Sequence, residues 1–194
     1  MKLKAFAIAA VAAMAFTALG AKSASATTLE VGGVTQNSPV TIDTSLKAGT
    51  ALVISRTDGS LANECGVSTF KGTTSVFTGA TVTAPLSNWS SSSCVRPRTF
   101  HKTGTLHVEH IAGTTDGTVS SSGAEWTTGS PFGTLNCKTG GGVDLGTLTG
   151  TDGTPSQHAE IDVNAVINCG FLVPSATWKG TYTVTSPTGL GVSA

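Results

Sequence analysis

The sequence predicts an all-β domain, and more specifically an antiparallel β-sandwich held by two disulfide bonds. The first observation is composition: the chain holds 33 Thr, 21 Ser and 24 Gly in 194 residues, and only 11% of its residues are charged. β-Branched side chains fit a pleated sheet, whereas the Ala, Leu, Glu and Lys periods of a helical bundle are missing. The second observation is a series of short segments in which apolar and polar residues alternate, and the third is four cysteines behind an export signal.

The N-terminus has the pattern of a secretory signal peptide, residues 1–26. Lys2 and Lys4 precede an apolar run, and Ala24-Ser25-Ala26 supplies the small residues that signal peptidases accept. The apolar run is about 15 residues long, short of the roughly 20 that a membrane-spanning helix needs. We therefore expect cleavage after Ala26 and a secreted, extracellular domain, 27–194, without a membrane span in the mature chain. A retained membrane anchor is the alternative.

The mature chain is mildly acidic, which excludes one class of partner. Without the leader it holds 8 basic and 11 acidic residues, a net charge of −3. No basic stripe is present that would neutralise phosphates, so we expect no nucleic-acid binding. The local cluster Arg96-Pro97-Arg98 is expected to be a solvated turn, with an anion site as the alternative. A mature chain of 168 residues fits a single domain.

Alternation of apolar and polar residues predicts the strands in chain order. At 159–167 the odd positions are apolar, although a short helix over 159–168 is an alternative. The clearest signal lies near the C-terminus, where Trp178 and Tyr182 share one face and a row of threonines shares the other. Three Asp-Gly pairs predict tight hairpin turns with positive φ. The expected strands are 50–56, 75–84, 100–112, 159–167 and 177–185, and the expected turns are Asp58-Gly59, Asp116-Gly117 and Asp152-Gly153.

The four cysteines mark a weak internal repeat, at 59–94 and 133–169. In each copy a Gly-Ser/Thr-Leu segment precedes one cysteine, and an apolar alternating segment precedes a second cysteine 29 or 32 residues later. Four cysteines allow three connectivities, and sequence alone does not decide between them. Metal ligation by these cysteines is not expected, because no C-x-x-C spacing occurs. The bonds that the repeat favours are Cys65–Cys94 and Cys137–Cys169.

The closing stretch 178–187 reads Trp-Lys-Gly-Thr-Tyr-Thr-Val-Thr-Ser-Pro. Together with the leader and the two cysteine-bounded segments, it resembles secreted β-rich bacterial proteins of the actinobacterial type. The resemblance covers about two-thirds of the chain. It implies a secreted β-rich domain without an established activity, and none of its motifs transfers a catalytic residue.

Motifs of the common enzyme classes are missing from the chain. It holds no G-x-S-x-G nucleophile motif, no phosphate-binding loop and no dinucleotide fingerprint. The cysteines are assigned to disulfide bonds, which leaves no thiol for catalysis. We therefore expect no cofactor and no enzymatic activity.

Two H-x-E pairs are the one constellation that suggests metal chemistry. His107 and Glu109 have the same spacing as His158 and Glu160. Residues two apart on a strand point to one face, about 6–7 Å from each other. If the two strands were neighbours, two imidazoles and two carboxylates would converge on a cation such as Zn²⁺. The simpler interpretation places all four on a solvated sheet face.

Two tryptophans are candidates for ligand binding. Trp89 precedes a run of four serines and Trp126 precedes two threonines, so both lie in polar surroundings typical of loops. Loops carry binding residues more often than other segments do. An exposed indole offers a flat apolar face to a sugar or a small apolar ligand. The alternative, which we favour, is that both rings close the ends of the core.

These observations favour a non-enzymatic secreted protein of the surface, matrix or adhesion type. One alternative is an extracellular module that binds carbohydrate or a small ligand through Trp89 and Trp126. The other is a secreted hydrolase or metal-dependent enzyme built around the two H-x-E pairs. The expected partners are cell-surface or matrix polymers, or further copies of the chain joined through exposed strand edges.

Overall fold

The structure, a computed structural model, describes residues 26–131 and 133–194. Of the predicted signal peptide only Ala26 falls within this part, so the leader lies outside the described residues. The described chain forms sixteen strands and no helix, which confirms the all-β prediction. The strands are β1 (Thr27–Val31), β2 (Val34–Thr35), β3 (Thr41–Leu46), β4 (Leu52–Arg56), β5 (Leu61–Thr73), β6 (Thr78–Gly79), β7 (Val82–Cys94), β8 (Arg98–Lys102), β9 (Thr105–His110), β10 (Gly117–Ser122), β11 (Glu125–Ser130), β12 (Gly133–Lys138), β13 (Gly141–Thr149), β14 (Glu160–Ile167), β15 (Ala176–Ser186) and β16 (Leu190–Ser193).

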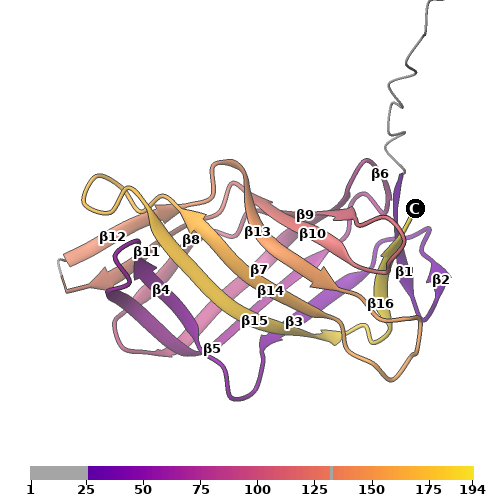
Figure 1. Ribbon diagram of the computed structural model, residues 1–194, viewed down its shortest axis with the longest axis horizontal. Coiled ribbons are helices and arrows are strands. Elements are labelled where there is room, and N and C mark those ends of the chain that lie inside the picture. The colour runs from indigo at the N-terminus through magenta and orange to yellow at the C-terminus, as the bar shows by residue number, and fades with distance from the viewer. Residues whose placement is uncertain (1–25, 132) are drawn as a thin grey trace, which may run out of the picture.

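The central sheet closes on itself and forms a barrel (Figure 1). Within the described residues eight strands follow one another around it in the order β14, β13, β10, β9, β7, β5, β3 and β15, and β15 pairs again with β14. β4 continues the position of β3, because it pairs with β15 on one side and with β5 on the other. The predicted sandwich is therefore corrected to a closed barrel, since the β14–β15 pairing joins the edges that an open sheet would leave free.

Two small sheets lie at the two ends of the barrel (Figure 1). The chain leaves the barrel after β7 to form β8 and again after β10 to form β11 and β12, and these strands pair in the order β12-β11-β8. At the opposite end β1 pairs with β16, β2 and β6, so the first and last strands lie side by side. We call the end with β8, β11 and β12 the braced end, and the end with β1, β2, β6 and β16 the capped end.

Both predicted disulfide bonds are present, and both lie toward the braced end. Cys65 and Cys94 face each other on the neighbouring strands β5 and β7. Cys137 of β12 bonds to Cys169, which lies just beyond β14, so this bond ties the small sheet to a barrel strand. In each copy of the predicted repeat the bond joins two antiparallel segments at the end remote from the turn that connects them.

Two predicted strands, 75–84 and 100–112, are interrupted near their middle. The predicted strand 75–84 reverses direction, because Val76 and Thr83 form an isolated bridge across a turn and β7 begins only at Val82. The segment 159–168 forms β14, and the helical alternative there is wrong.

The predicted strand 100–112 is divided into β8 and β9 at Gly104. This glycine has a positive φ of 76°, and a Cβ there would lie 2.5 Å from the carbonyl oxygen of Ser122 and 2.6 Å from the nitrogen of Ala124. Only glycine permits such an approach of two backbones in this conformation. The break allows the chain to leave the small sheet and re-enter the barrel.

Two of the three predicted Asp-Gly turns share one geometry. The carboxylates of Asp58 and Asp152 each accept hydrogen bonds from the hydroxyl and the backbone N–H two residues later. These bonds lower the pKa of both carboxyl groups, the hydroxyl contributing most, and the glycine after each has a positive φ. The prediction for the third pair is wrong, because Gly117 does not have a positive φ and begins β10, while the carboxylate of Asp116 accepts a hydrogen bond from the N–H of Gly150.

Inward side chains fill the barrel, and they differ between its two halves. Toward the capped end the lining is aliphatic apart from Phe70 and surrounds a cavity of about 30 Å³ that no polar side chain enters. An apolar cavity of this kind stays dry. Toward the braced end the interior is an aromatic cluster in which neighbouring ring centres lie 4.8–6.1 Å apart, made of Phe70, Trp89, Phe100, Trp126, Trp178 and Tyr182.

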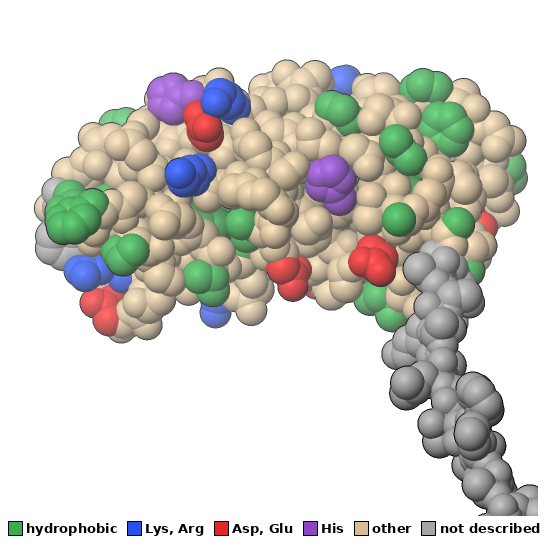
Figure 2. Space-filling view, turned by 90° about the horizontal axis from the view of Figure 1, so that it is seen from above, with side chains coloured by type: hydrophobic (Ala, Val, Ile, Leu, Met, Phe, Trp, Pro, Cys, Tyr) green, Lys and Arg blue, Asp and Glu red, His purple; other side chains and the backbone are tan. Residues whose placement is uncertain are grey.

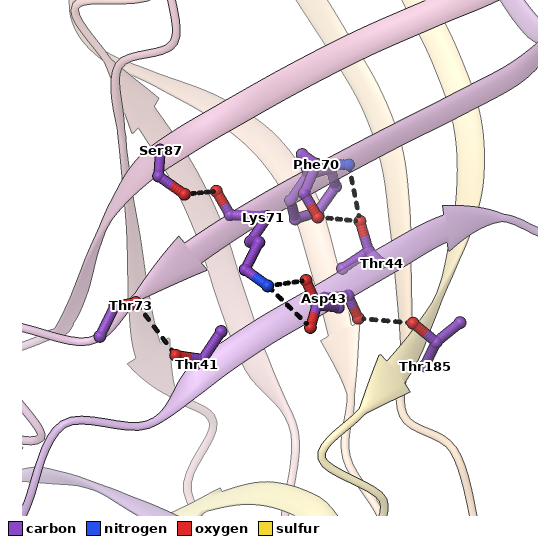
Figure 3. A network of polar contacts seen from close by, with 8 residues as sticks. All are labelled: Thr41, Asp43, Thr44, Phe70, Lys71, Thr73, Ser87 and Thr185. Atoms are coloured by element: carbon purple, nitrogen blue, oxygen red, sulfur yellow. Dashed lines mark hydrogen bonds and ion pairs between the residues drawn. The ribbon is translucent and has the colours of Figure 1, made fainter.

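Polar side chains on the outer face bond from strand to strand (Figure 3). Lys71 Nζ lies 3.1 Å from the carboxylate of Asp43, and Thr185 donates to the Asp43 carbonyl. The hydroxyls of Thr41 and Thr73 lie 3.2 Å apart on β3 and β5. Threonine and serine hydroxyls thus supply cross-strand bonds on a surface with few charges.

Candidate functional site

The most unusual buried group is the guanidinium of Arg98, which lies within the aromatic cluster. Its central carbon lies 4.6 Å from the ring centre of Phe100, 5.2 Å from that of Trp126 and 5.8 Å from that of Trp178. All three guanidinium nitrogens are inaccessible to solvent and have no hydrogen-bond acceptor among the described residues. A cation over a ring face gains about 2 kcal/mol when water is excluded. The predicted solvated turn at 96–98 is therefore wrong for Arg98, which packs into the core.

Burial changes the titration of two groups in this cluster. It lowers the pKa of Arg98 to about 10, because loss of water disfavours the charged form. It raises the pKa of Tyr182, whose hydroxyl donates to Ser68 Oγ at 3.0 Å. At neutral pH the cluster therefore holds one cation and one neutral phenol. Because Arg98 lines neither of the two small cavities inside the barrel, we interpret it as a packing group that holds β8 over the barrel end.

Trp89 and Trp126 do not form an exposed platform for a ligand. Trp89 is 5% exposed and Trp126 is 1% exposed, and both belong to the aromatic cluster. The serines that follow Trp89 continue β7 and are not a loop, while Trp126 occupies a buried position of β11. The prediction of exposed indoles is wrong, and the alternative that both rings close the core is confirmed.

The two H-x-E pairs face outward but do not come together. β9, which carries His107 and Glu109, is separated from β14, which carries Glu160, by β10 and β13. With a strand spacing of about 4.8 Å, the pairs lie roughly 14 Å apart around the barrel. His158 Nδ1 lies 2.7 Å from a backbone carbonyl, and Glu160 forms an ion pair with Lys47 at 2.7 Å. In the described part of the chain no three His, Cys, Asp or Glu side chains are arranged to hold a metal ion.

The imidazole of His107 lies within hydrogen-bond distance of two hydroxyl groups. Its Nε2 lies 3.1 Å from Ser122 Oγ and its Nδ1 lies 3.4 Å from Thr83 Oγ1. A serine beside an imidazole begins an acyl-transfer site, which also needs N–H donors aimed at the developing oxyanion. The N–H groups of Gly123 and Ala124, next along the chain, already donate to the segment between β12 and β13. The pair therefore lacks the nearest donors that such chemistry would use.

The sequence did not predict one exposed feature, the loop 168–175 between β14 and β15. At its tip Phe171 is 98% exposed and Leu172 is 61% exposed, and we call these two residues the apolar tip. The base of the loop is fixed: Cys169 is disulfide-bonded, and its N–H donates to the carbonyl of the buried Val173 at 3.1 Å. An apolar pair held in solvent on a fixed loop is typical of an interaction site.

Charges divide unevenly along the barrel. In Figure 2 blue side chains are more frequent over the half away from the grey segment, and most of the remaining surface is uncharged. In the described chain, the part of the barrel toward the braced end, which we call the braced half, carries the basic residues Arg56, Arg96, Arg98, Lys102, Lys138 and Lys179 and the acidic residues Asp58, Glu64, Glu125 and Asp144. The remainder, which we call the capped half, carries the basic residues Lys47 and Lys71 and the acidic residues Glu30, Asp43, Glu109, Asp116, Asp152, Glu160 and Asp162.

Comparison of the chain with protein-family models, with curated proteins and with solved structures gives no match. Across residues 26–131 and 133–194, no helix is long and apolar enough to cross a membrane. Any functional conclusion therefore depends on the geometry of the described residues.

Proposed function

We propose that the protein is a non-enzymatic, secreted protein of the surface, matrix or adhesion type that makes contact through its apolar tip. The observation that carries the proposal is the nearly complete exposure of Phe171 on a loop whose base is fixed by a disulfide bond. A loop that is already ordered loses little conformational entropy on binding, which favours affinity.

Three further features support this proposal. The barrel interior is packed, and its cavity of about 30 Å³ is far below the several hundred Å³ of a typical small-molecule pocket. Two disulfide bonds suit an oxidising compartment. Cleavage after Ala26 would leave Thr27 first, and Thr27 is the buried first residue of β1, so processing would remove no part of the described strands.

Secretion is tested by expressing the full chain in a bacterial host with an active export pathway. We expect the chain in the periplasm or medium, with both disulfide bonds formed and Thr27 as its first residue by N-terminal sequencing. A chain that keeps its leader and stays in the cytoplasm would contradict the proposal.

Contact through the apolar tip is tested by cosedimentation of the mature chain with intact cells and with insoluble wall or matrix polymers. We expect binding that is lost in the double variant Phe171→Ser/Leu172→Ser. The control is Val34→Ser at the capped end, which removes a side chain whose exposure of 63% is close to the 61% of Leu172. Equal binding by the double variant and the wild type, or no binding to any of these surfaces, would refute the proposal.

A further inference from the structure

We infer that the apolar tip docks on a lipid bilayer surface that carries anionic headgroups. The inference rests on the proposed function, because it names the partner of the same loop. It is carried by three properties of the loop and its surroundings: the absence of charge within it, basic residues in register with both of its ends, and the small area of the tip.

The loop can enter an apolar phase without taking a charge out of water. No charged residue occurs between Asp162 and Lys179, so the loop and the strand ends beside it are uncharged. Two backbone N–H groups at its base are already bonded, that of Cys169 to the Val173 carbonyl and that of Gly170 to Asn168 Oδ1 at 2.9 Å. Both the charge penalty and part of the backbone penalty of leaving water are therefore avoided.

Basic residues stand beside both ends of the loop. Lys138 is exposed on β12, and its backbone pairs with Asn168 at the start of the loop. Arg56 of β4 lies opposite Ala176, which follows the end of the loop. A basic residue near an anionic membrane surface strengthens binding by roughly fivefold. Because the acidic residues lie mostly in the other half of the barrel, the field of the molecule would turn the braced end toward an anionic surface.

The area of the tip favours a continuous apolar phase over a second copy of the chain. Phe171 and Leu172 together offer about 300–400 Å², less than half of the roughly 800 Å² per partner in a stable protein interface. Insertion of a few apolar side chains combined with basic residues is a common basis of reversible membrane-surface binding.

The test is flotation of the mature, disulfide-bonded chain with vesicles of two compositions. One is phosphatidylcholine alone, and the other is two parts phosphatidylcholine to one part phosphatidylglycerol. We expect binding to the mixed vesicles that weakens as salt is added. Phe171→Ser should weaken binding by about 10- to 100-fold, and Lys138→Gln by about fivefold. The controls Val34→Ser and Lys71→Gln should bind as the wild type does.

Insertion is observed directly in the variant Phe171→Trp. The three native indoles are buried, so an added exposed indole contributes a red-shifted emission band. We expect that band to move to shorter wavelength on mixed vesicles and to be quenched by lipids brominated along the acyl chain. Flotation without this blue shift would mean binding by charge alone and would overturn insertion of the tip.

The outcomes separate this inference from the proposed function. If the wild type binds to neither vesicle composition yet binds cells or polymers in a way that depends on Phe171, the assignment of a lipid partner is wrong and the proposed contact role stands. If vesicle binding occurs but is unaffected by Phe171→Ser, the assignment of the tip is wrong. If the double variant behaves as the wild type in every assay, both proposals fall.

Discussion

The two halves of the barrel are built on different principles. The braced half holds the aromatic cluster, a buried cation and both disulfide bonds, whereas the capped half holds aliphatic side chains around a small cavity. The braced half also carries the apolar tip and most of the basic residues. Cross-links and tight aromatic packing thus occur together with the feature to which we assign function.

The difference shows how a chain with few charges can hold the base of an exposed apolar loop in place. A loop end is normally mobile because few contacts hold it. Here Cys169 joins it to β12, and β12 is held through β11 by Trp126, which packs against Trp178 of the barrel at 5.5 Å between ring centres. The capped half contains neither disulfide bond, and its strands are held by apolar burial and hydrogen bonds.

The largest expected effect comes from removing a bond of the braced half. In the double variant Cys137→Ser/Cys169→Ser a loop closed over 32 residues is released. We expect the free energy of unfolding to fall by roughly 3–4 kcal/mol, measured by urea denaturation. Amide hydrogen exchange should quicken in β11, β12 and the loop 168–175, while β1 and β16 stay as in the wild type.

The matched variant is Cys65→Ser/Cys94→Ser, which opens a loop of nearly the same length, closed over 29 residues, within the barrel. Its loss of stability should be similar, but exchange in the loop 168–175 should change little. Equal quickening of the loop in both variants would contradict the assignment of loop bracing to Cys169.

A smaller effect is expected from the buried cation. The fall in the pKa of Arg98 to about 10 corresponds to a burial cost of about 3 kcal/mol. Methionine keeps much of the volume and removes the charge, at the loss of the cation–π contacts. We expect Arg98→Met to raise the free energy of unfolding by about 1–2 kcal/mol, with Lys179→Met as the exposed control. If the free energy of unfolding falls clearly in Arg98→Met and not in Lys179→Met, the cation–π contacts of Arg98 stabilise the fold by more than burial of its charge costs.

Alkaline pH separates the two titrating groups of the aromatic cluster. The pKa of Tyr182 is raised above 10.0 in the fold, so the unfolded chain loses that proton first and stability falls as pH rises past 10.0. Arg98 has the opposite effect on stability. Between its folded pKa of about 10 and its higher unfolded pKa the unfolded chain holds more protons, so this group makes stability rise with pH.

Tyr182→Phe removes only the first of these effects. We therefore expect its free energy of unfolding, followed by urea denaturation above pH 10, to exceed the wild-type trend by up to about 1.4 kcal/mol per pH unit. The two proteins are compared by the change of their free energy of unfolding with pH, because loss of the hydrogen bond to Ser68 changes the free energy of unfolding of the variant by the same amount at every pH. Parallel slopes in the two proteins would show that the phenol does not titrate differently in the fold.

The sequence predicted features that depend on neighbours along the chain. Alternation places Tyr182 inward and Thr183 outward without knowledge of the partner strand, and cysteine spacing indicated the pairing of Cys65 with Cys94. Closure of the barrel was not predictable in this way. It needs β15 to pair with β3, where Val184 meets Thr44 from a distant part of the chain, and no local pattern records that register.

The wrong predictions for Trp89 and Arg98, which were expected in a loop and in a solvated turn, have a similar explanation. Trp89 precedes four serines, which resemble a loop, yet all four continue the long strand β7, where Ser91 is half-buried and the other three are exposed. Arg98 was expected in solvent because charged side chains are rarely buried, and its three aromatic neighbours come from three different strands. The apolar tip had a local signal that was overlooked, since Phe171 and Leu172 lie between a glycine and a proline, where turns are typical.

A pair of variants tests the contrast between the halves with one type of substitution. Ala84 lines the cavity of the capped half, and valine there fills part of the space, so we expect Ala84→Val to raise the free energy of unfolding by about 1 kcal/mol. Ala165 pairs with Trp178 in the braced half, where added methyl groups find no room, so Ala165→Val should lower it by about 1–3 kcal/mol. Urea denaturation of both variants under one condition gives the signs. Opposite signs follow only if the halves differ in packing, whereas two losses of equal size would mean that the capped half is as full as the braced half.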